Sequence, residues 1–294
     1  MLGRILEMCS SRTIALPNRP RGRSSSGMRT MNYRGRWVLL TGASSGLGLE
    51  MAKVLARDYG ANLVLVARRE ERLRKLAEEL TAAHGIETHV VAADLMKEED
   101  VSRVVEESIG GRDLYAAILN AGVTHFGHHH ELSWADFQNM LSLNVSSVVQ
   151  LTTLLLPYLE ERREDGGIMI ISSLAGLTPV AYQTAYSATK AFLVNYGCGL
   201  HHEMHHRGVS VTTFAPGGII TEMTAGERFN SLRAWLMPAD KCAEEAIESF
   251  SRRRYLYVPG AMMRWGTSLT KFVPQRFLVG RVAAQYRRSL SKHG

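Results

Sequence analysis

From residue 36 onward, the chain alternates short apolar runs with longer stretches in which apolar residues recur every three or four positions. Unbroken apolar runs are typical of strands covered on both faces, and the longer period is typical of amphipathic helices. The pattern predicts strands at 37–41, 62–67, 88–92, 115–119, 167–172, 209–214 and 255–258. It predicts helices at 47–59, 70–83, 98–109, 133–162, 184–206 and 239–251.

Strand and helix therefore alternate through one continuous segment. Right-handed crossovers between such strands build a doubly wound parallel sheet, so we expect an α/β fold. Neither a linker nor an internal repeat interrupts residues 36–260, which we assign to one domain. Residues 1–35 lack hydrophobic periodicity and are expected to form a basic, disordered extension.

The composition, 45% hydrophobic and 21% charged over 294 residues, excludes disordered and collagen-like proteins. Three cysteines without a C-x-x-C pair argue against a disulfide framework and against zinc held by thiolates. No apolar run reaches the roughly 18 residues that a transmembrane helix needs, so we expect no membrane span.

The net charge of +7 is unevenly distributed. Residues 1–35 hold seven arginines and one acid, residues 249–294 hold ten basic residues and no acid, and the segment between them holds 27 acidic against 18 basic residues. A nucleic-acid-binding domain would carry basic charge on its folded body, so this class is excluded. The Arg- and Ser-rich start resembles a mitochondrial leader. We favour a tail on a cytoplasmic protein, or an upstream extension of a chain that starts at Met28 or Met31.

A glycine-rich turn links the first predicted strand to the first helix, with the sequence Thr41-Gly42-Ala43-Ser44-Ser45-Gly46-Leu47-Gly48. Glycines here let the backbone approach a ligand, and the free N–H groups of the helix start bind phosphate. The same residues match G-x-S-x-G, the nucleophile elbow of serine hydrolases, in which Ser44 would attack an acyl group. That alternative needs an oxyanion loop before the turn, where only the Arg-rich tail exists. It also needs a histidine, for which the candidates are His201, His202, His205 and His206.

A second constellation lies further along the chain. Tyr186 and Lys190 are four residues apart, hence on one face of the predicted helix, and Ser173 stands at the end of the strand before it. Asn144 lies in the long helix after the fourth strand. Two further motifs follow the fourth and sixth strands, Asn120-Ala121-Gly122 and Pro216-Gly217. A Tyr-x-x-x-Lys pair alone is most often a surface pair, but the full set at these strand ends is specific.

In these residues the chain resembles the short-chain dehydrogenase/reductase (SDR) family over residues 36–260. The resemblance implies a dinucleotide-binding catalytic domain with a single Rossmann-type sheet of about seven strands, and assembly as a homodimer or homotetramer. It implies a catalytic tetrad of Asn144, Ser173, Tyr186 and Lys190. It implies cofactor contacts from Gly42, Ser44, Ser45, Gly46, Leu47, Arg68, Arg69, Asp94, Leu95, Asn120, Ala121, Gly122, Tyr186, Lys190, Pro216, Gly217, Ile219 and Thr221. Hydride transfer in such a protein needs no metal.

Acid–base chemistry explains why these residue types stand together. Reducing a ketone requires a hydride on carbon and a proton on oxygen, and the pKa of a free tyrosine, about 10, lies about three units too high for this near neutrality. The ammonium of Lys190 and the positive nicotinamide would lower the pKa of Tyr186. Ser173 would hold the carbonyl oxygen, Lys190 would also hold the ribose, and Asn144 would bind a water that relays the proton.

The residues after the second strand bear on the choice of cofactor. An acid there would bind an adenosine ribose, whereas this chain has Arg68 and Arg69, whose guanidinium groups suit a 2′-phosphate. We therefore expect NADP(H) rather than NAD(H). By the same resemblance Asp94-Leu95 would contact the adenine, Ile219 the carboxamide and Thr221 a phosphate.

Two apolar segments bear on the substrate and on partners. Residues 261–294 interleave apolar with basic residues, which predicts a basic helical extension lying on anionic lipid; the alternative is packing against another subunit. Residues 218–238 are expected to form a flexible lid over a hydrophobic fatty-acyl, steroid-like or lipid substrate. The apolar residues of this lid are Met223, Phe229, Leu232, Trp235, Leu236 and Met237.

Three classes of function follow from the sequence. The favoured one is an NADP(H)-dependent carbonyl reductase or alcohol dehydrogenase. The second is the serine hydrolase that would use Ser44. The third is a non-catalytic nucleotide sensor of the same fold, a class that usually lacks part of the tetrad, whereas all four residues are present here. The histidines at 201–206 are better explained as a solvated helix end than as a metal site.

Overall fold

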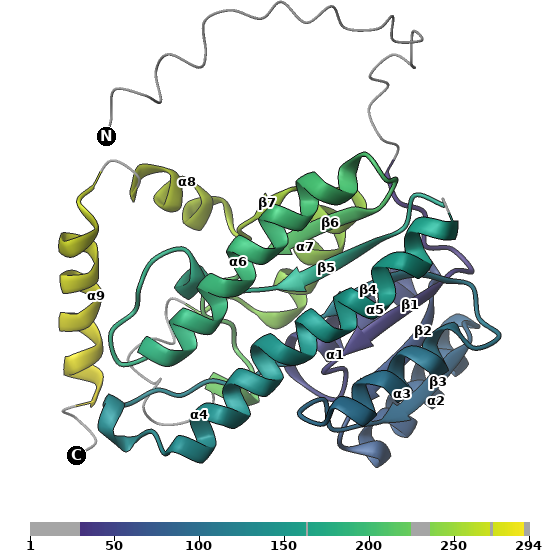
Figure 1. Ribbon diagram of the computed structural model, residues 1–294, viewed down its shortest axis with the longest axis horizontal. Helices are drawn as coiled ribbons and strands as arrows, with labels where there is room; N and C mark the ends of the chain where they lie inside the picture. The colour runs from purple at the N-terminus through teal and green to yellow at the C-terminus, as the bar shows by residue number, and fades with distance from the viewer. Residues whose placement is uncertain (1–29, 163, 225–235, 271–272, 291–294) are drawn as a thin grey trace, which may run out of the picture.

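The structure, a computed structural model, describes residues 30–162, 164–224, 236–270 and 273–290. Its centre is a parallel sheet of seven strands in the order β3-β2-β1-β4-β5-β6-β7 (Figure 1). This confirms the predicted doubly wound α/β fold. The order reverses between β1 and β4, the point at which open α/β sheets bind ligands. The strands are β1 (Trp37–Thr41), β2 (Asn62–Ala67), β3 (Thr88–Ala92), β4 (Leu114–Leu119), β5 (Gly167–Ile171), β6 (Ser210–Phe214) and β7 (Leu256–Tyr257).

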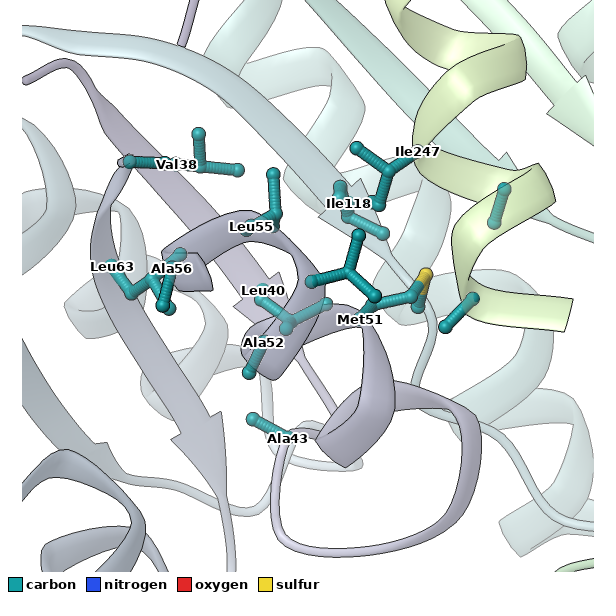
Figure 2. Close-up of a cluster of buried hydrophobic side chains, with 14 of the residues drawn as sticks. Val38, Leu40, Ala43, Met51, Ala52, Leu55, Ala56, Leu63, Ile118 and Ile247 are labelled. Carbon is teal, nitrogen blue, oxygen red and sulfur yellow. The ribbon is translucent and has the colours of Figure 1, made fainter. Parts of the chain in front are cut away.

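Helices cover both faces of the sheet. On one face lie α1 (Gly46–Tyr59), α2 (Glu70–His84) and α7 (Ala239–Ser251), and on the other α3 (Glu98–Ile109), α5 (Ser147–Arg162) and α6 (Thr184–His205). Because side chains alternate along a strand, Leu40 of β1 enters the first cluster of buried residues and Leu39 the second. Figure 2 shows the first cluster, in which Leu40 lies with Met51 of α1 and Ile247 of α7.

The long helix on the second face contains a local irregularity. Helix α4 (Trp134–Leu141) continues through a π-helical turn, η3 (Ser142–Ser146), into α5. In this turn the Ser147 N–H donates to the carbonyl of Ser142, five residues back. Single π turns inside helices are frequent at functional sites, and this one carries Asn144.

By length and composition, the described part of the chain has one helix apolar enough to cross a membrane, Trp134–Arg162. Polar residues interrupt this helix, so it contains no unbroken apolar run of the length that the sequence criterion required. Val148, Leu151, Leu155 and Leu159 on this helix are buried in the second cluster. This burial is typical of a core helix.

Residues 30–35, which were predicted to belong to the N-terminal extension, pack against the domain. Tyr33 is fully buried, with its ring edge-on to Tyr59 at 5.5 Å and to Tyr115 at 5.9 Å. The Met31 N–H donates to the carbonyl of Ser251 at 2.8 Å. Two buried side chains in six residues are too few to produce a period, so the sequence pattern could not separate them from the tail. The rest of the predicted extension, residues 1–29, lies outside the described residues.

Two helices, α8 (Ala261–Thr270) and α9 (Gln275–Leu290), follow the last strand. In Figure 1, α9 is drawn in yellow at one end of the molecule. Its Tyr286 ring packs edge-on against Phe126, with the ring centroids 5.2 Å apart. The next residue, Arg287, donates from Nε to the hydroxyl of Tyr182 at 3.3 Å. These contacts attach α9 to the loops that follow β4 and β5.

Candidate active site

The carboxyl ends of the strands open into a cavity of about 1020 Å³. It is bordered by the turn after β1, by the loops after β2 to β6, by the start of α6, and by α8 and α9. Every residue that the sequence assigned to cofactor or catalysis lines this cavity except Asn144. The charged residues among its lining are Arg68, Arg69, Asp94, Lys190 and Glu222.

The glycine-rich turn is closely packed against the end of β4. Gly42 has a φ of 70°, and a Cβ on it would lie only 2.8 Å from the side-chain nitrogen of Asn120. A Cβ on Gly48 would overlap the carbonyl oxygen of Gly42. Thr41 Oγ1 accepts hydrogen bonds from the N–H groups of Asn120 and Ala121 at 2.9 and 3.1 Å. These contacts hold the start of α1 beside the end of β4.

The N-terminus of α1 is open to a ligand at the cavity. Ser45, its N-cap, makes no side-chain cap hydrogen bond, and the first turn contains no acidic residue. Gly46 and Leu47, the first two helical residues, line the cavity. A helix start without a side-chain cap attracts phosphate through its N–H groups and its dipole. The residues present therefore fit the pyrophosphate of a dinucleotide.

Arg69, at the start of α2, is held across the opening of the cavity. Its guanidinium donates to the hydroxyls of Ser44 and Ser45 at 3.2 and 2.7 Å. It also pairs at 3.1 Å with Glu222, which stands at the start of η5 (Glu222–Thr224). Arg72 binds the same carboxylate at 2.7 Å, and hydrogen bonds from Arg72 and then Arg69 lower the pKa of Glu222. This ion-pair set joins the residues after β2 to those after β6.

Arg68 differs from its neighbour. It is exposed and lines the cavity, and it makes no hydrogen bond or ion pair with any residue that the structure describes. Asp94 and Leu95, after β3, line the same part of the cavity. Of the two arginines, Arg68 is therefore the one available to a ligand.

Tyr186 lies in the first turn of α6, and its hydroxyl hydrogen-bonds to Ser173. Ser173 follows β5 and caps a short 3₁₀ turn, η4 (Leu174–Gly176), accepting the Ala175 N–H at 3.1 Å. Burial raises the pKa of Tyr186, the hydrogen bond with Ser173 lowers it, and neighbouring Tyr286 raises it. The net effect is a raised pKa.

Lys190 lies one turn further along α6, with its amine buried. Its Nζ donates to the carbonyl of Ile171 at 3.0 Å and lies 5.8 Å from the ring centroid of Tyr186. Burial lowers the pKa of Lys190 to about 8, so the amine is still mainly protonated near neutrality. In the protein alone, burial of the phenol is the largest effect on the pKa of Tyr186; the expected lowering by Lys190 together with the oxidised nicotinamide stays a prediction.

Asn144 is placed differently from the prediction. It is fully buried behind the cavity, and its Nδ2 donates to the carbonyl of Val123 at 2.9 Å and to Thr189 Oγ1 at 3.1 Å. Its Oδ1 accepts the Val123 N–H at 2.9 Å. The side chain that was expected to bind a relay water is therefore engaged with the loop after β4 and with the helix that carries Lys190.

The predicted lid is described only at its two ends. Ile219 forms a parallel bridge with Met237, whose N–H donates to the carbonyl of Gly218 at 2.9 Å. Thr224 Oγ1 donates to the carbonyl of Ile219 at 2.6 Å. Residues 225–235, which include Phe229, Leu232 and Trp235, and the side chain of Met223 lie outside the described residues.

No histidine lines the cavity that Ser44 borders, or the smaller one of about 470 Å³ beside it, among the residues described. His202 follows Tyr186 by sixteen residues of α6, which amounts to about 24 Å of helix. His201 instead hydrogen-bonds the carbonyl of Val211 at 2.7 Å. In the part of the chain that the structure describes, Ser44 therefore has no histidine to act as its base. Within the described ranges no group of three or more His, Cys, Asp or Glu side chains could hold a metal.

Sequence reasoning missed a wall of the cavity built by the C-terminal helices. Leu278, Val282 and Tyr286 line it from α9, and Met263 lines it from α8. The i, i+4, i+8 spacing of the three α9 residues was the available signal for one apolar face. That face was assigned to a lipid surface, whereas here it contributes to the cavity.

A model of the family described as short chain dehydrogenase matches residues 36–231. The chain belongs to the short-chain dehydrogenase/reductase family. This SDR is therefore an oxidoreductase of the class that acts on CH–OH groups, and its cofactor is a nicotinamide dinucleotide.

Relatives and solved structures support this assignment. The chain is 34% identical to the very-long-chain 3-oxoacyl-CoA reductase of Anas platyrhynchos over 65% of its own length and 62% of that relative. It is 31% identical to the 17-beta-hydroxysteroid dehydrogenase type 3 of Mus musculus over 91% and 88% of the two chains. A short-chain dehydrogenase from Sphingobium yanoikuyae in complex with NADPH superposes with a TM-score of 0.73 at 29% identity, covering 79% of this chain and 91% of that one.

Proposed function

We propose that this SDR is an NADP(H)-dependent oxidoreductase that transfers a hydride between nicotinamide and the carbonyl or alcohol group of a hydrophobic substrate. The observation that carries the proposal is the meeting of Ser173, Tyr186 and Lys190 at the same cavity as the uncapped start of α1. One cavity thus offers a phosphate site and an acid–base pair.

In this proposal Tyr186 moves the proton. Its hydroxyl donates to the carbonyl oxygen during reduction and takes the proton back during oxidation, and Ser173, already bonded to the phenol, holds the same oxygen. The bound nicotinamide supplies or accepts the hydride, and its oxidised form adds a positive charge. Since burial raises the pKa of Tyr186, the protein alone keeps the phenol protonated, which suits donation to a ketone.

Lys190 and Asn144 take supporting roles. The ammonium of Lys190, held on the Ile171 carbonyl, stands close enough to the phenol to favour its deprotonated form once positive charge is added nearby. Asn144 positions the site by tying the Val123 backbone to Thr189, the residue next to Lys190. We therefore assign Asn144 a positioning role rather than water binding through its side chain.

The substrate class follows from the lining of the cavity. Apart from Lys190, the charged lining residues belong to the loops after β2, β3 and β6, where the nucleotide would bind. The opposite wall is built largely from apolar residues such as Val180, Met263 and Leu278. An uncharged, apolar alcohol or ketone fits this wall, in keeping with the lipid and steroid names of the relatives.

Two observations favour NADP(H). The carboxylate that an NAD-dependent protein uses to bind the adenosine ribose is replaced after β2 by Arg68, and this guanidinium is unengaged with the described residues. The neighbouring Arg69 adds positive charge, and it is fixed on Ser44 and Ser45. A planar guanidinium beside a helix start suits a 2′-phosphate.

The surface of the C-terminal helices supports peripheral contact with an anionic membrane. Met262, Trp265 and Phe277 are 68, 74 and 62% exposed, and residues 249–294 contain ten basic side chains and no acid. Exposed aromatic residues among arginines are typical of surfaces that rest on anionic lipid. Assembly into a dimer or tetramer stays a prediction, for which Leu154 and Phe192, exposed on α5 and α6, are suitable apolar surface.

The Tyr186→Phe variant tests the proposed function. With the phenolic proton removed, we expect NADPH-dependent reduction of aliphatic ketones to fall by about 10³-fold or more, while the dissociation constant for NADPH stays within about threefold of wild type. The measurements are initial rates of NADPH oxidation and fluorescence titration of NADPH. Retained turnover in the variant would contradict the role of Tyr186.

The same assay separates the alternatives. NADPH binding by the wild-type protein without turnover of any ketone or alcohol in a panel would favour the non-catalytic sensor. Labelling of Ser44 by a fluorophosphonate would favour the hydrolase.

A further inference from the structure

We propose that Tyr286 of helix α9 is a specificity-determining residue, whose ring closes the apolar end of the cavity over the carbon chain of the substrate. The proposal rests on the proposed carbonyl-reductase function and deepens it. It concerns a part of the chain that lies beyond the family match, which ends at residue 231.

Tyr286 belongs to a continuous apolar face of α9. Leu278, Val282 and Tyr286, spaced by four residues, all line the cavity. The Tyr286 ring is fixed edge-on against Phe126 at 5.2 Å. Burial raises the pKa of the Tyr286 phenol, and Tyr186 lines the same cavity. Tyr286 therefore lines the same cavity as the group that would meet the reacting carbonyl.

The ring is held in place by a second attachment at the adjacent residue. Arg287 donates to the hydroxyl of Tyr182 at 3.3 Å, and the carbonyl of Tyr182 accepts the Gly127 N–H at 3.0 Å. Phe126 and Tyr182, the two contacts of α9, therefore lie on loops that are bonded to each other. Tyr182 adopts a φ of 65°, a backbone region that a tyrosine seldom occupies, which indicates that this junction is closely defined by its surroundings. Two consecutive residues of α9 thus fasten the helix across both loops.

The chemistry of this wall defines what it can select. The α8 and α9 residues that line the cavity are Met263, Gly266, Thr267, Leu278, Val282, Gln285 and Tyr286. None of them is charged, so the wall offers apolar contact and three neutral polar groups, those of Thr267, Gln285 and Tyr286, to the substrate. An aromatic ring in such a wall stabilises carbons beyond the carbonyl by excluding water from them. A ketone whose carbon chain is too short to reach the ring gains no binding free energy from it.

The test compares a long with a short methyl ketone. For Tyr286→Ala we expect kcat/KM for octan-2-one to fall by about tenfold or more, mainly through KM, while kcat/KM for butan-2-one changes by less than about threefold. Tyr286→Phe, which keeps the ring, should stay within about threefold for both ketones. Phe277→Ala, an aromatic residue exposed on the same helix, is the matched control and should leave both values unchanged.

A binding measurement keeps this result separate from the proposed function. In the Tyr186→Phe background, calorimetric titration of octan-2-one into the NADPH-bound protein should show weaker binding when Tyr286→Ala is added. Equal losses for both ketones, or no loss of kcat/KM and of binding, would overturn the role of Tyr286. If the wild-type protein reduces no ketone, the proposed function fails, and the titration still decides whether Tyr286 forms the substrate wall.

Discussion

The buried ammonium of Lys190 is the residue-scale feature most at odds with stability. A charged amine in a protein interior loses its hydration, and here it recovers one hydrogen bond, to the carbonyl of Ile171. Its pKa of about 8, against an ordinary value of 10.5, amounts to about 3 kcal/mol of unfavourable free energy near neutral pH. Residues that weaken the folded state in this way are commonly retained for function.

We expect Lys190→Met to stabilise the cofactor-free protein by about 1–3 kcal/mol at pH 7 and to abolish turnover. The stability gain should shrink as pH rises. Between pH 8 and 10.5 the folded wild-type protein has lost the Lys190 proton that the unfolded chain still binds, so unfolding takes up a proton and wild-type stability rises with pH there. Urea unfolding of both proteins at pH 7, 8, 9 and 10 measures the difference.

The control for this series is Lys75→Met, because Lys75 is a surface residue with its side chain 80% exposed. Its unfolding free energy should stay within about 0.5 kcal/mol of wild type at every pH. A difference between Lys190→Met and wild type that stays constant from pH 7 to 10 would show that burial does not lower the pKa of Lys190 in the folded protein.

For individual residues, spacing along the sequence predicted which side chains come together, but not which groups they hydrogen-bond to. Ser173, Tyr186 and Lys190 could be predicted to converge because a strand end and one helix face fix their positions. The partners of Asn144 depend on how the loop after β4 folds back to present Val123, and no sequence period reports that. The opposing effects of burial and charge on Tyr186 likewise depend on the surrounding packing.

Among the elements, strands buried on both faces were the most predictable. The predicted bounds 37–41 and 62–67 coincide with β1 and β2, because almost every residue in these two runs is buried. The predicted 88–92 coincides with β3, an edge strand in which only Val91 is buried. The π turn η3 was not predicted, since one extra residue in a turn leaves the helical period almost unchanged. The apolar face of α9 was detected, but an apolar face alone does not say what it packs against.

The connection between β2 and α2 makes the cofactor preference testable at the scale of an element. Arg69 is engaged with Ser44, Ser45 and Glu222, so Arg68 is the guanidinium that can meet a 2′-phosphate. We expect Arg68→Ala to raise the dissociation constant for NADPH by about tenfold or more and that for NADH by less than about threefold. Fluorescence titration with both dinucleotides measures the two constants.

Arg74→Ala is the matched control for this comparison. Arg74 lies on α2, the helix that follows Arg68, forms a surface ion pair with Glu70 and does not line the cavity. Both dissociation constants should therefore stay at their wild-type values. Equal weakening of NADPH and NADH by Arg68→Ala would remove the basis for a preference for NADP(H).

Over the whole molecule, the C-terminal helices present two different surfaces. The face with Leu278, Val282 and Tyr286 lines the cavity, while Met262, Trp265 and Phe277 remain exposed. The body between residues 36 and 248 is acidic, and the segment after it carries no acid. An anionic bilayer would attract this end of the molecule and repel the body, and it would thereby place the wall of the cavity next to a store of apolar substrate.

This arrangement predicts how the protein distributes between water and vesicles. Full-length protein should pellet with vesicles of 70% phosphatidylcholine and 30% phosphatidylserine, pellet less with pure phosphatidylcholine, and be released as salt is raised.

The double variant Trp265→Ser/Phe277→Ser should bind the anionic vesicles at least about tenfold more weakly, since each aromatic side chain contributes apolar area to the bilayer. Trp134→Ser is the matched control, because Trp134 is 71% exposed on α4 and belongs to neither C-terminal helix, and its loss should not change pelleting. Equal pelleting of wild type and the double variant, or equal binding to neutral and anionic vesicles, would exclude this surface as the membrane contact.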